Sequence, residues 1–144
     1  MKLLRILLLL CLILIQRPAG AEVMTLHIGK HRIRAEIADT PHSQARGLKE
    51  RIHLCADCGM LFVFKKAVRY DFWMKDTPLP LSIAFIASNG SILNIEEMQP
   101  NTTDIHSSAG AAQYVLEMNR GWFAIKGITS GHIVRELKPA PNRH

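Results

Sequence analysis

The sequence has no uninterrupted apolar run long enough to cross a bilayer. Its longest run, Ile6–Ile15, has ten residues, whereas a membrane-spanning helix needs about 20. Lys2 and Arg5 precede this run, and Ala19-Gly20-Ala21 follows it with small residues where a signal peptidase reads. This tripartite pattern is typical of a secretory signal peptide. We therefore predict that residues 1–21 are a cleaved leader and that the protein is exported, to a periplasm or to the extracellular space.

A retained N-terminal anchor is the alternative for this segment. A lipoprotein is less favoured, because Leu10 precedes Cys11 where a small residue is expected. If the leader is removed, the mature protein has no membrane-spanning segment.

A strong charge of one sign is also lacking once the leader is removed. The full chain carries 18 basic and 12 acidic side chains, and the leader contains three of the basic ones and none of the acidic ones. The mature chain then has a net charge of +3, which is ordinary for a soluble domain. No basic stripe with interleaved aromatic residues is present, so the sequence does not favour nucleic-acid binding.

Cysteine is scarce, since only Cys55 and Cys58 remain after the leader. An even number of cysteines in an exported chain favours a disulfide, which closes a short loop and stabilises by about 2 kcal/mol. A redox-active pair is an alternative, although such pairs usually open a helix and Gly59 argues against one here. A metal site that includes His53 is the other alternative, but a fourth ligand is not visible nearby. We expect neither a metal nor another cofactor.

Signatures of a catalytic nucleophile are missing as well. Asp104, His106, Ser107 and Ser108 lie in the polar segment Gln99–Ala112. These residue types form a nucleophilic site only in a defined geometry, and no Gly-x-Ser-x-Gly motif accompanies them. The simpler interpretation is a solvated loop, so we name no catalytic residue and do not favour an enzyme.

Short alternating segments dominate the rest of the chain. Gly29-Lys30 interrupts one alternating stretch and Asn89-Gly90 another, and such pairs are strong signals for hairpin turns. The pattern predicts one β-rich domain over residues 22–138 with a flexible tail over 139–144, and we find no internal repeat. The expected fold is mostly β (α+β), a compact antiparallel β-sandwich or barrel-like domain with one or two short helices. The first expected hairpin covers Val23–Ala38. Further strands are expected over Met60–Phe64, Phe72–Thr77, Leu81–Ala87, Ile92–Met98, Tyr114–Met118 and Ile133–Leu137, with a basic connection over Lys65–Arg69.

Two short helices are predicted. Thr40-Pro41 supplies an N-cap and a proline at the first helical position, and the helix is expected to fade near Arg51. The second covers Gly121–Lys126, with Gly127 as its C-terminal stop. The apolar face of the first helix is formed by Ala45, Leu48 and Ile52.

Several short strings in the chain resemble the domain of unknown function family 192, also called uncharacterised protein family 0127. The resemblance covers almost the whole mature chain and implies a compact β-sandwich or barrel-like fold, frequently exported, without an established activity. The strings are Arg46-Gly47-Leu48, Gly59-Met60-Leu61-Phe62-Val63-Phe64, Phe72-Trp73-Met74-Lys75, Pro80-Leu81, Tyr114-Val115-Leu116-Glu117, and Gly127-Ile128 followed by Gly131.

The chain departs from the family pattern at three places. Asp76 stands where members often have Asn, and Ser82 stands where they often have Asp. Cys55 and Cys58 lie in a loop that usually lacks such a pair. The serine at position 82 weakens any proposal of a catalytic site with two carboxylates.

Trp73, Lys75, Glu117 and Arg46 form the candidate ligand-binding set. In a strand, Trp73 and Lys75 point to one side and Phe72 and Met74 to the other. Trp73 then either lies on a partly covered face under the stem of Lys75, or offers a rigid platform for a ligand.

Glu117 also has two interpretations. Between Leu116 and Met118, a carboxylate needs a partner if it is buried. It either forms an exposed ion pair with Lys75, Arg46 or Arg120, worth well under about 1 kcal/mol, or lies in a pocket beside Trp73.

We therefore predict a non-catalytic, exported module that binds a small or extended ligand, or a protein partner, through a Trp/Lys/Glu strand face. A thiol-redox or metal-binding module built on Cys55 and Cys58 is the alternative. A purely structural domain that binds a partner is the third possibility.

Overall fold

The computed structural model of the chain describes residues 20–141. The predicted leader lies outside the described residues except for its last two, and so do residues 142–144 of the predicted tail. Neither helix in the described part of the chain is long and apolar enough to cross a membrane.

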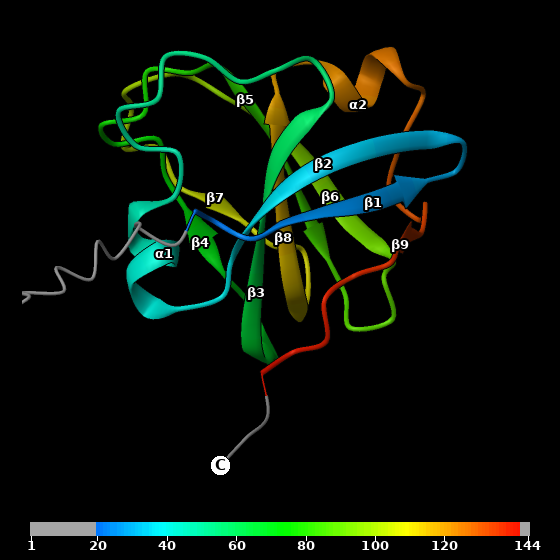
Figure 1. Cartoon of the computed structure of the whole chain (residues 1–144). Helices are drawn as coiled ribbons and strands as arrows, with labels where there is room; N and C mark the ends of the chain where they lie inside the picture. The colour runs from blue at the N-terminus through cyan, green and yellow to red at the C-terminus, as the bar shows by residue number, and fades with distance from the viewer. Residues whose placement is uncertain (1–19, 142–144) are drawn as a thin grey trace, which may run out of the picture.

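The described chain forms a curled sheet, a small two-stranded ribbon and two short helices (Figure 1). The seven strands of the sheet follow the order β6-β5-β8-β3-β2-β1-β9, and β4 pairs with β7 in the ribbon. The mostly β fold expected from the sequence is confirmed. In chain order the elements are β1 (Val23–Ile28), β2 (His31–Ala38), α1 (Pro41–Arg46), β3 (Cys58–Val68), β4 (Asp71–Phe72), β5 (Leu81–Ile86), β6 (Ile92–Met98), β7 (His106–Ser107), β8 (Ala112–Asn119), α2 (Trp122–Ile125) and β9 (Val134–Arg135).

Both predicted hairpins are present. β1 and β2 pair antiparallel, and Gly29 between them takes the positive φ of 57° that the tight turn requires. β5 and β6 pair antiparallel about Asn89-Gly90, where the Asn89 side chain accepts a hydrogen bond from the Ser91 amide at 3.0 Å. The turn chemistry in the sequence therefore sets the register at both places.

One pair of neighbouring strands, β2 and β3, runs parallel, which the antiparallel expectation did not include. Parallel neighbours need a connection that returns to the same end of the sheet. Here α1 and the loop that carries the cysteines supply this connection. The crossover places α1 against one face of the sheet, beside β4 (Figure 1).

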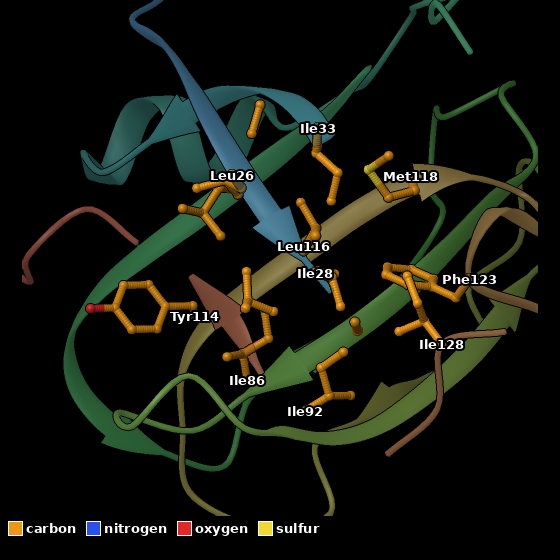
Figure 2. Close-up of a cluster of buried hydrophobic side chains, with 14 of the residues drawn as sticks. Leu26, Ile28, Ile33, Ile86, Ile92, Tyr114, Leu116, Met118, Phe123 and Ile128 are labelled. Carbon is orange, nitrogen blue, oxygen red and sulfur yellow. The ribbon is translucent and has the colours of Figure 1, made fainter. Parts of the chain in front are cut away.

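The sheet buries apolar side chains on both faces. Tyr114, Leu116 and Met118 of β8 enter a first cluster, and Val115 enters a second, as the alternation along this strand predicts. Figure 2 shows the first cluster, in which side chains from several strands and from α2 converge on Leu116. The second cluster lies on the opposite face, beneath α1 and the ribbon, and includes Phe62, Met74 and Phe85.

The first helix is shorter than predicted. It ends at Arg46, because Gly47 takes φ 49° and ψ −135°, which is not helical. Leu48 is buried as expected, but Ile52 is 87% exposed and lies on no helix. The prediction of a helix to Arg51 was wrong. The apolar residues Ala45, Leu48 and Ile52 have helical spacing, but Gly47 ends the helix before the last two of them.

The predicted strand over Phe72–Thr77 is also shorter, because β4 ends at Phe72. Asp76 takes a left-handed φ of 55°, a conformation that Asp and Asn tolerate better than most residues. The alternation nevertheless holds in part, because Met74 is buried while Trp73 and Lys75 are exposed.

Other strand limits depend on partners far away in the sequence. β3 continues to Val68 through the predicted basic connection, pairing there with Ala112 of β8. β7 interrupts the segment expected to be a loop, because it pairs with β4. β9 is reduced to Val134 and Arg135, which pair with the end of β1.

Candidate functional site

A pocket of about 380 Å³ opens on the second face of the sheet, between α1 and β4. Gln44–Lys49 forms one wall and Tyr70–Trp73 the other. Between the walls the lining comes from side chains of the central strands β3 and β8, together with Thr77. The strand residues are Phe62, Phe64 and Glu117.

The α1 wall is held by local sequence signals. Thr40 caps the helix, with a reciprocal hydrogen-bonded capping box to Ser43. Gln44 donates its side-chain amide to the backbone oxygen of Val63 at 2.9 Å, which ties the helix to β3. A Cβ atom on Gly47 would lie 3.4 Å from the Phe62 ring, so the turn sits close on the sheet.

Aromatic rings form the opposite wall and part of the floor. Phe64 and Tyr70 stack with centroids 3.8 Å apart, and the edge of Phe72 meets Phe62 at 5.0 Å. Trp73 extends the wall to the rim, where 46% of its surface remains exposed. Stacked and edge-to-face ring pairs of this kind stabilise by about 0.5–1.5 kcal/mol each beyond the area they bury, which helps to hold this wall together.

Glu117 lies within this apolar lining. Glu117 is on β8, and its cross-strand neighbours are Met60 on β3 and Ile83 on β5, both apolar and buried. Only 5% of its surface is exposed, and burial raises the pKa of its carboxyl group to about 8. Within residues 20–141, no hydrogen bond or ion pair reaches this carboxyl group, which is therefore mostly protonated at neutral pH.

The charged side chains of the pocket stand at its walls. Arg46 and Lys49 come from the α1 side, and Asp71 comes from β4, where it accepts a hydrogen bond from the Ser107 hydroxyl. The charge of Arg46 also acts on Glu36, outside the pocket. The Arg51 guanidinium, bonded to Glu36 at 2.6 and 2.8 Å, and secondarily Arg46 hold the pKa of that carboxyl below its usual value.

Three of the four residues in the candidate ligand-binding set line this pocket: Arg46, Trp73 and Glu117. Lys75 does not line it, but its Nζ lies 5.6 Å from the centroid of the Trp73 ring, at cation–π distance. The ion pair considered for Glu117 is absent from the described structure, and Arg120 lies near Glu97 instead, at 3.8 Å.

The sequence interpretation missed Phe64 and Tyr70, Gln44 of α1, and Lys49 of the turn that follows α1. One signal for the aromatic wall was available, because Phe62 and Phe64 alternate along one strand face and Tyr70 begins a run of aromatic residues. No local signal could place α1 opposite that wall, since this depends on the parallel crossover.

The Cys55–Cys58 disulfide is present, on a loop that does not line the pocket. Asp57 within the loop accepts a hydrogen bond from Trp122 Nε1 at 2.9 Å, and the Asn119 side chain donates to the Cys55 oxygen at 3.0 Å. The loop is thereby fastened to α2 and the end of β8. While the two sulfurs are bonded to each other, neither is a thiolate that could bind a metal.

The polar residues of the Gln99–Ala112 segment do not form a nucleophilic site in the described structure. Ser107 donates to Asp71, and Ser108 donates to the Gly110 oxygen at 2.8 Å. His106 bonds through Nδ1 to Glu96 at 2.7 Å rather than to either serine.

The departure at position 82 lies outside the pocket. Ser82 is fully buried, donates to Glu97 at 2.7 Å and accepts from the Gly121 amide at 2.8 Å. It therefore connects β5 and β6 to the start of α2, and it does not face Glu117.

The fold and the site together define a class: a small curled-sheet domain that carries an aromatic pocket with a buried carboxyl group. The chain belongs to the DUF192 family, described as "Uncharacterized ACR", whose model matches residues 24–135. The resemblance seen in the sequence is thus confirmed.

Two solved structures share this fold. A protein of unknown function from Novosphingobium aromaticivorans is 32% identical, with a TM-score of 0.78 over 82% of this chain and 88% of that one. A protein from Sinorhizobium meliloti, named a "putative transcription regulator", is 35% identical, with a TM-score of 0.73 over 77% of this chain and 89% of that one. No significant match exists among curated proteins.

Proposed function

We propose that this protein is an exported, non-catalytic module that binds a small ligand in the pocket between α1 and β4. One observation carries the proposal: Glu117 lies at the floor of a 380 Å³ pocket, 5% exposed, with no partner for its carboxyl group in the described chain.

A stability role does not explain this arrangement. Burial of a polar group without a hydrogen bond costs free energy, and an apolar residue between Met60 and Ile83 would pack without that cost. A ligand that bonds to the carboxyl group would supply the missing partner. Ligand pockets typically combine apolar walls with a few convergent polar groups, which matches this lining.

The non-catalytic part of the proposal rests on the surroundings of Glu117. Catalytic sites that work with two carboxyl groups, as in glycoside hydrolysis, need a second acidic side chain free to act beside the first. Within the described chain, Asp71 is the one other acidic side chain that lines the pocket, and it already accepts a hydrogen bond from Ser107. The pocket is better suited to holding a ligand than to moving its protons.

The experiment is a thermal-shift screen of the purified protein against a library of small amines, acids, amides and sugars. We expect at least one class to raise the melting temperature of the wild type and not that of Trp73→Ala. Because Trp73 is half-exposed, its truncation should cost less stability than the roughly 3–5 kcal/mol of a core aromatic deletion.

Two control variants show what a change outside the pocket and a change in the core each do to the melting temperature. Ile125→Ala removes an exposed apolar side chain on α2, away from the pocket, and should keep every binding signal. Trp122→Ala removes a buried ring and should destabilise strongly. The proposal fails if no compound stabilises the wild type, or if Trp73→Ala unfolds as readily as Trp122→Ala.

A further inference from the structure

We propose that the group held in this pocket is an organic ammonium ion, with its nitrogen facing Glu117 and its carbon substituents against the aromatic wall. The inference rests on the proposed function and names the chemical class of the ligand. It follows from the rings and from the hydrogen bonds already made around the pocket, and the balance of charge permits it.

The rings favour a cation. Phe62, Phe64, Tyr70, Phe72 and Trp73 all line the pocket, and four of them touch one another. The face of an aromatic ring carries negative electrostatic potential, so groups of rings attract alkylated ammonium ions while also burying their carbon atoms. The Lys75 ammonium group over Trp73 shows the same attraction within this protein.

The neutral polar side chains of the lining already have partners. The Gln44 amide donates to Val63, and the Thr77 hydroxyl donates to the Lys75 oxygen at 3.2 Å. A sugar or another polyhydroxyl ligand would need several such groups free at once. Glu117 lies in the lining with no hydrogen-bond partner for its carboxyl group in the described chain. An ammonium N–H group donates a hydrogen bond to a carboxylate, and an N-methylated ammonium ion neutralises its charge.

The charges that face Glu117 permit this ion. Arg46 and Lys49 line the pocket from the α1 side, and Tyr70 and Asp71 line it from the opposite wall. Burial raises the pKa of Tyr70, which is therefore neutral. With Glu117 ionised, two cationic and two anionic side chains line the pocket, and Glu36 outside it partly offsets the charge of Arg46.

Binding of a cation must be linked to a proton. In the empty pocket the carboxyl group of Glu117, with its pKa near 8, is protonated at pH 7. A nearby positive charge favours the ionised form, so binding at pH 7 should release close to one proton. The affinity should then be about tenfold higher at pH 9 than at pH 7, because the ionised fraction rises by that factor.

The test uses three compounds of nearly equal shape: choline, its neutral isostere 3,3-dimethylbutanol, and the anion 3,3-dimethylbutyrate. Titration calorimetry of the purified protein in two buffers of different ionisation enthalpy measures affinity and proton release together. We expect choline to bind most tightly, with proton release at pH 7 that fades by pH 9.

Variants separate the carboxyl group from the rest of the pocket. Glu117→Gln keeps the shape of the side chain. It should abolish proton release and lower the affinity for choline by about tenfold or more, while the affinity for the neutral isostere stays unchanged. Glu136→Gln, at the exposed pair with His27, is the matched control and should behave as the wild type. The pH dependence of the wild type requires no variant, so the test stands even if Glu117→Gln folds poorly.

Each outcome decides the inference. Tighter binding of the neutral or the anionic compound, or choline binding without proton release at pH 7, overturns the ammonium ion but leaves the pocket as a binding site. Failure of all three compounds also overturns it, and the thermal-shift screen with Trp73→Ala then decides separately whether the proposed function stands.

Discussion

At the scale of single residues, Glu117 is the most unusual position in the described chain. It occupies a central strand between two apolar neighbours, where a β-branched or aliphatic residue is the stable choice. The protein thus keeps a group that costs stability as soon as it ionises. Such a residue commonly marks a functional site, because function rather than packing explains its presence.

The buried carboxyl group predicts how stability depends on pH. In the folded protein the pKa of Glu117 is about 8, against 4.5 for the ordinary group. Between these values the folded state keeps a proton that the unfolded state has released, so the free energy of unfolding should fall as pH rises from 4.5 to 8. The expected fall is a few kcal/mol.

Urea unfolding of the wild type and of Glu117→Gln across this pH range measures the effect. The difference between the two profiles isolates Glu117 from the other titrating groups, and the variant should lack the decline. Parallel profiles for the two proteins would show that the carboxyl group ionises in its folded position as easily as in water.

At the scale of elements, α1 and the cysteine loop show how short segments are held in place. α1 has six residues, none of them buried, so packing of the helix itself contributes little. Isolated helices of this length are unstable in water. Its cap, the Gln44 bond to β3 and the turn at Gly47 therefore maintain the pocket wall.

Removal of the cap should affect both stability and the pocket. Thr40→Ala deletes the side-chain half of the capping box and should cost about 1 kcal/mol. Because α1 carries one wall, the same variant should also weaken whatever ligand the thermal-shift screen identifies. Thr103→Ala, at an exposed loop position, is the control for both measurements. Full ligand affinity in Thr40→Ala would mean that the sheet alone forms the binding surface.

The disulfide is predicted to be a structural staple without redox activity. Reduction, or the double change Cys55→Ser and Cys58→Ser, should lower the free energy of unfolding by about 2 kcal/mol, because it releases a closed loop. Alkylation of the mature protein with and without reductant reports the thiols. Thiols that react without reductant, or stoichiometric zinc by elemental analysis, would favour the thiol or metal module instead.

At the scale of the whole molecule, the curled sheet must cover two apolar faces. The first face is covered by the opposite part of the curled sheet together with α2. Its buried apolar side chains form one continuous cluster (Figure 2). The second face depends on α1, the ribbon and the loops around them. These small elements do not cover it completely, and the pocket is the part that they leave open.

Export is the prediction that concerns the chain as a whole. The apolar leader and Ala19-Gly20-Ala21 should direct cleavage, so that the mature protein begins near Glu22. Intact mass of the protein recovered from the exported fraction tests this. A mass that includes Met1 in that fraction would favour a retained anchor.

The sequence by itself determined the features that depend on neighbouring residues. The turns at Gly29 and Asn89-Gly90, the cap at Thr40 and the alternation along β8 are local, since backbone geometry and side-chain period act over a few residues. The family strings are local as well. These features were enough for the mostly β fold and for selecting Arg46, Trp73 and Glu117 as candidates.

Only the tertiary structure decided what those residues do together. The parallel crossover between β2 and β3 brings Arg46 opposite Trp73, and pairing of β8 with β3 and β5 turns Glu117 from an exposed charge into a buried one. The alternation of side chains along a strand tells which residues share a face of the sheet, but not which of the two faces another element covers. Burial and the pKa of a carboxyl group depend on that covering, so they follow from segments far apart in the chain.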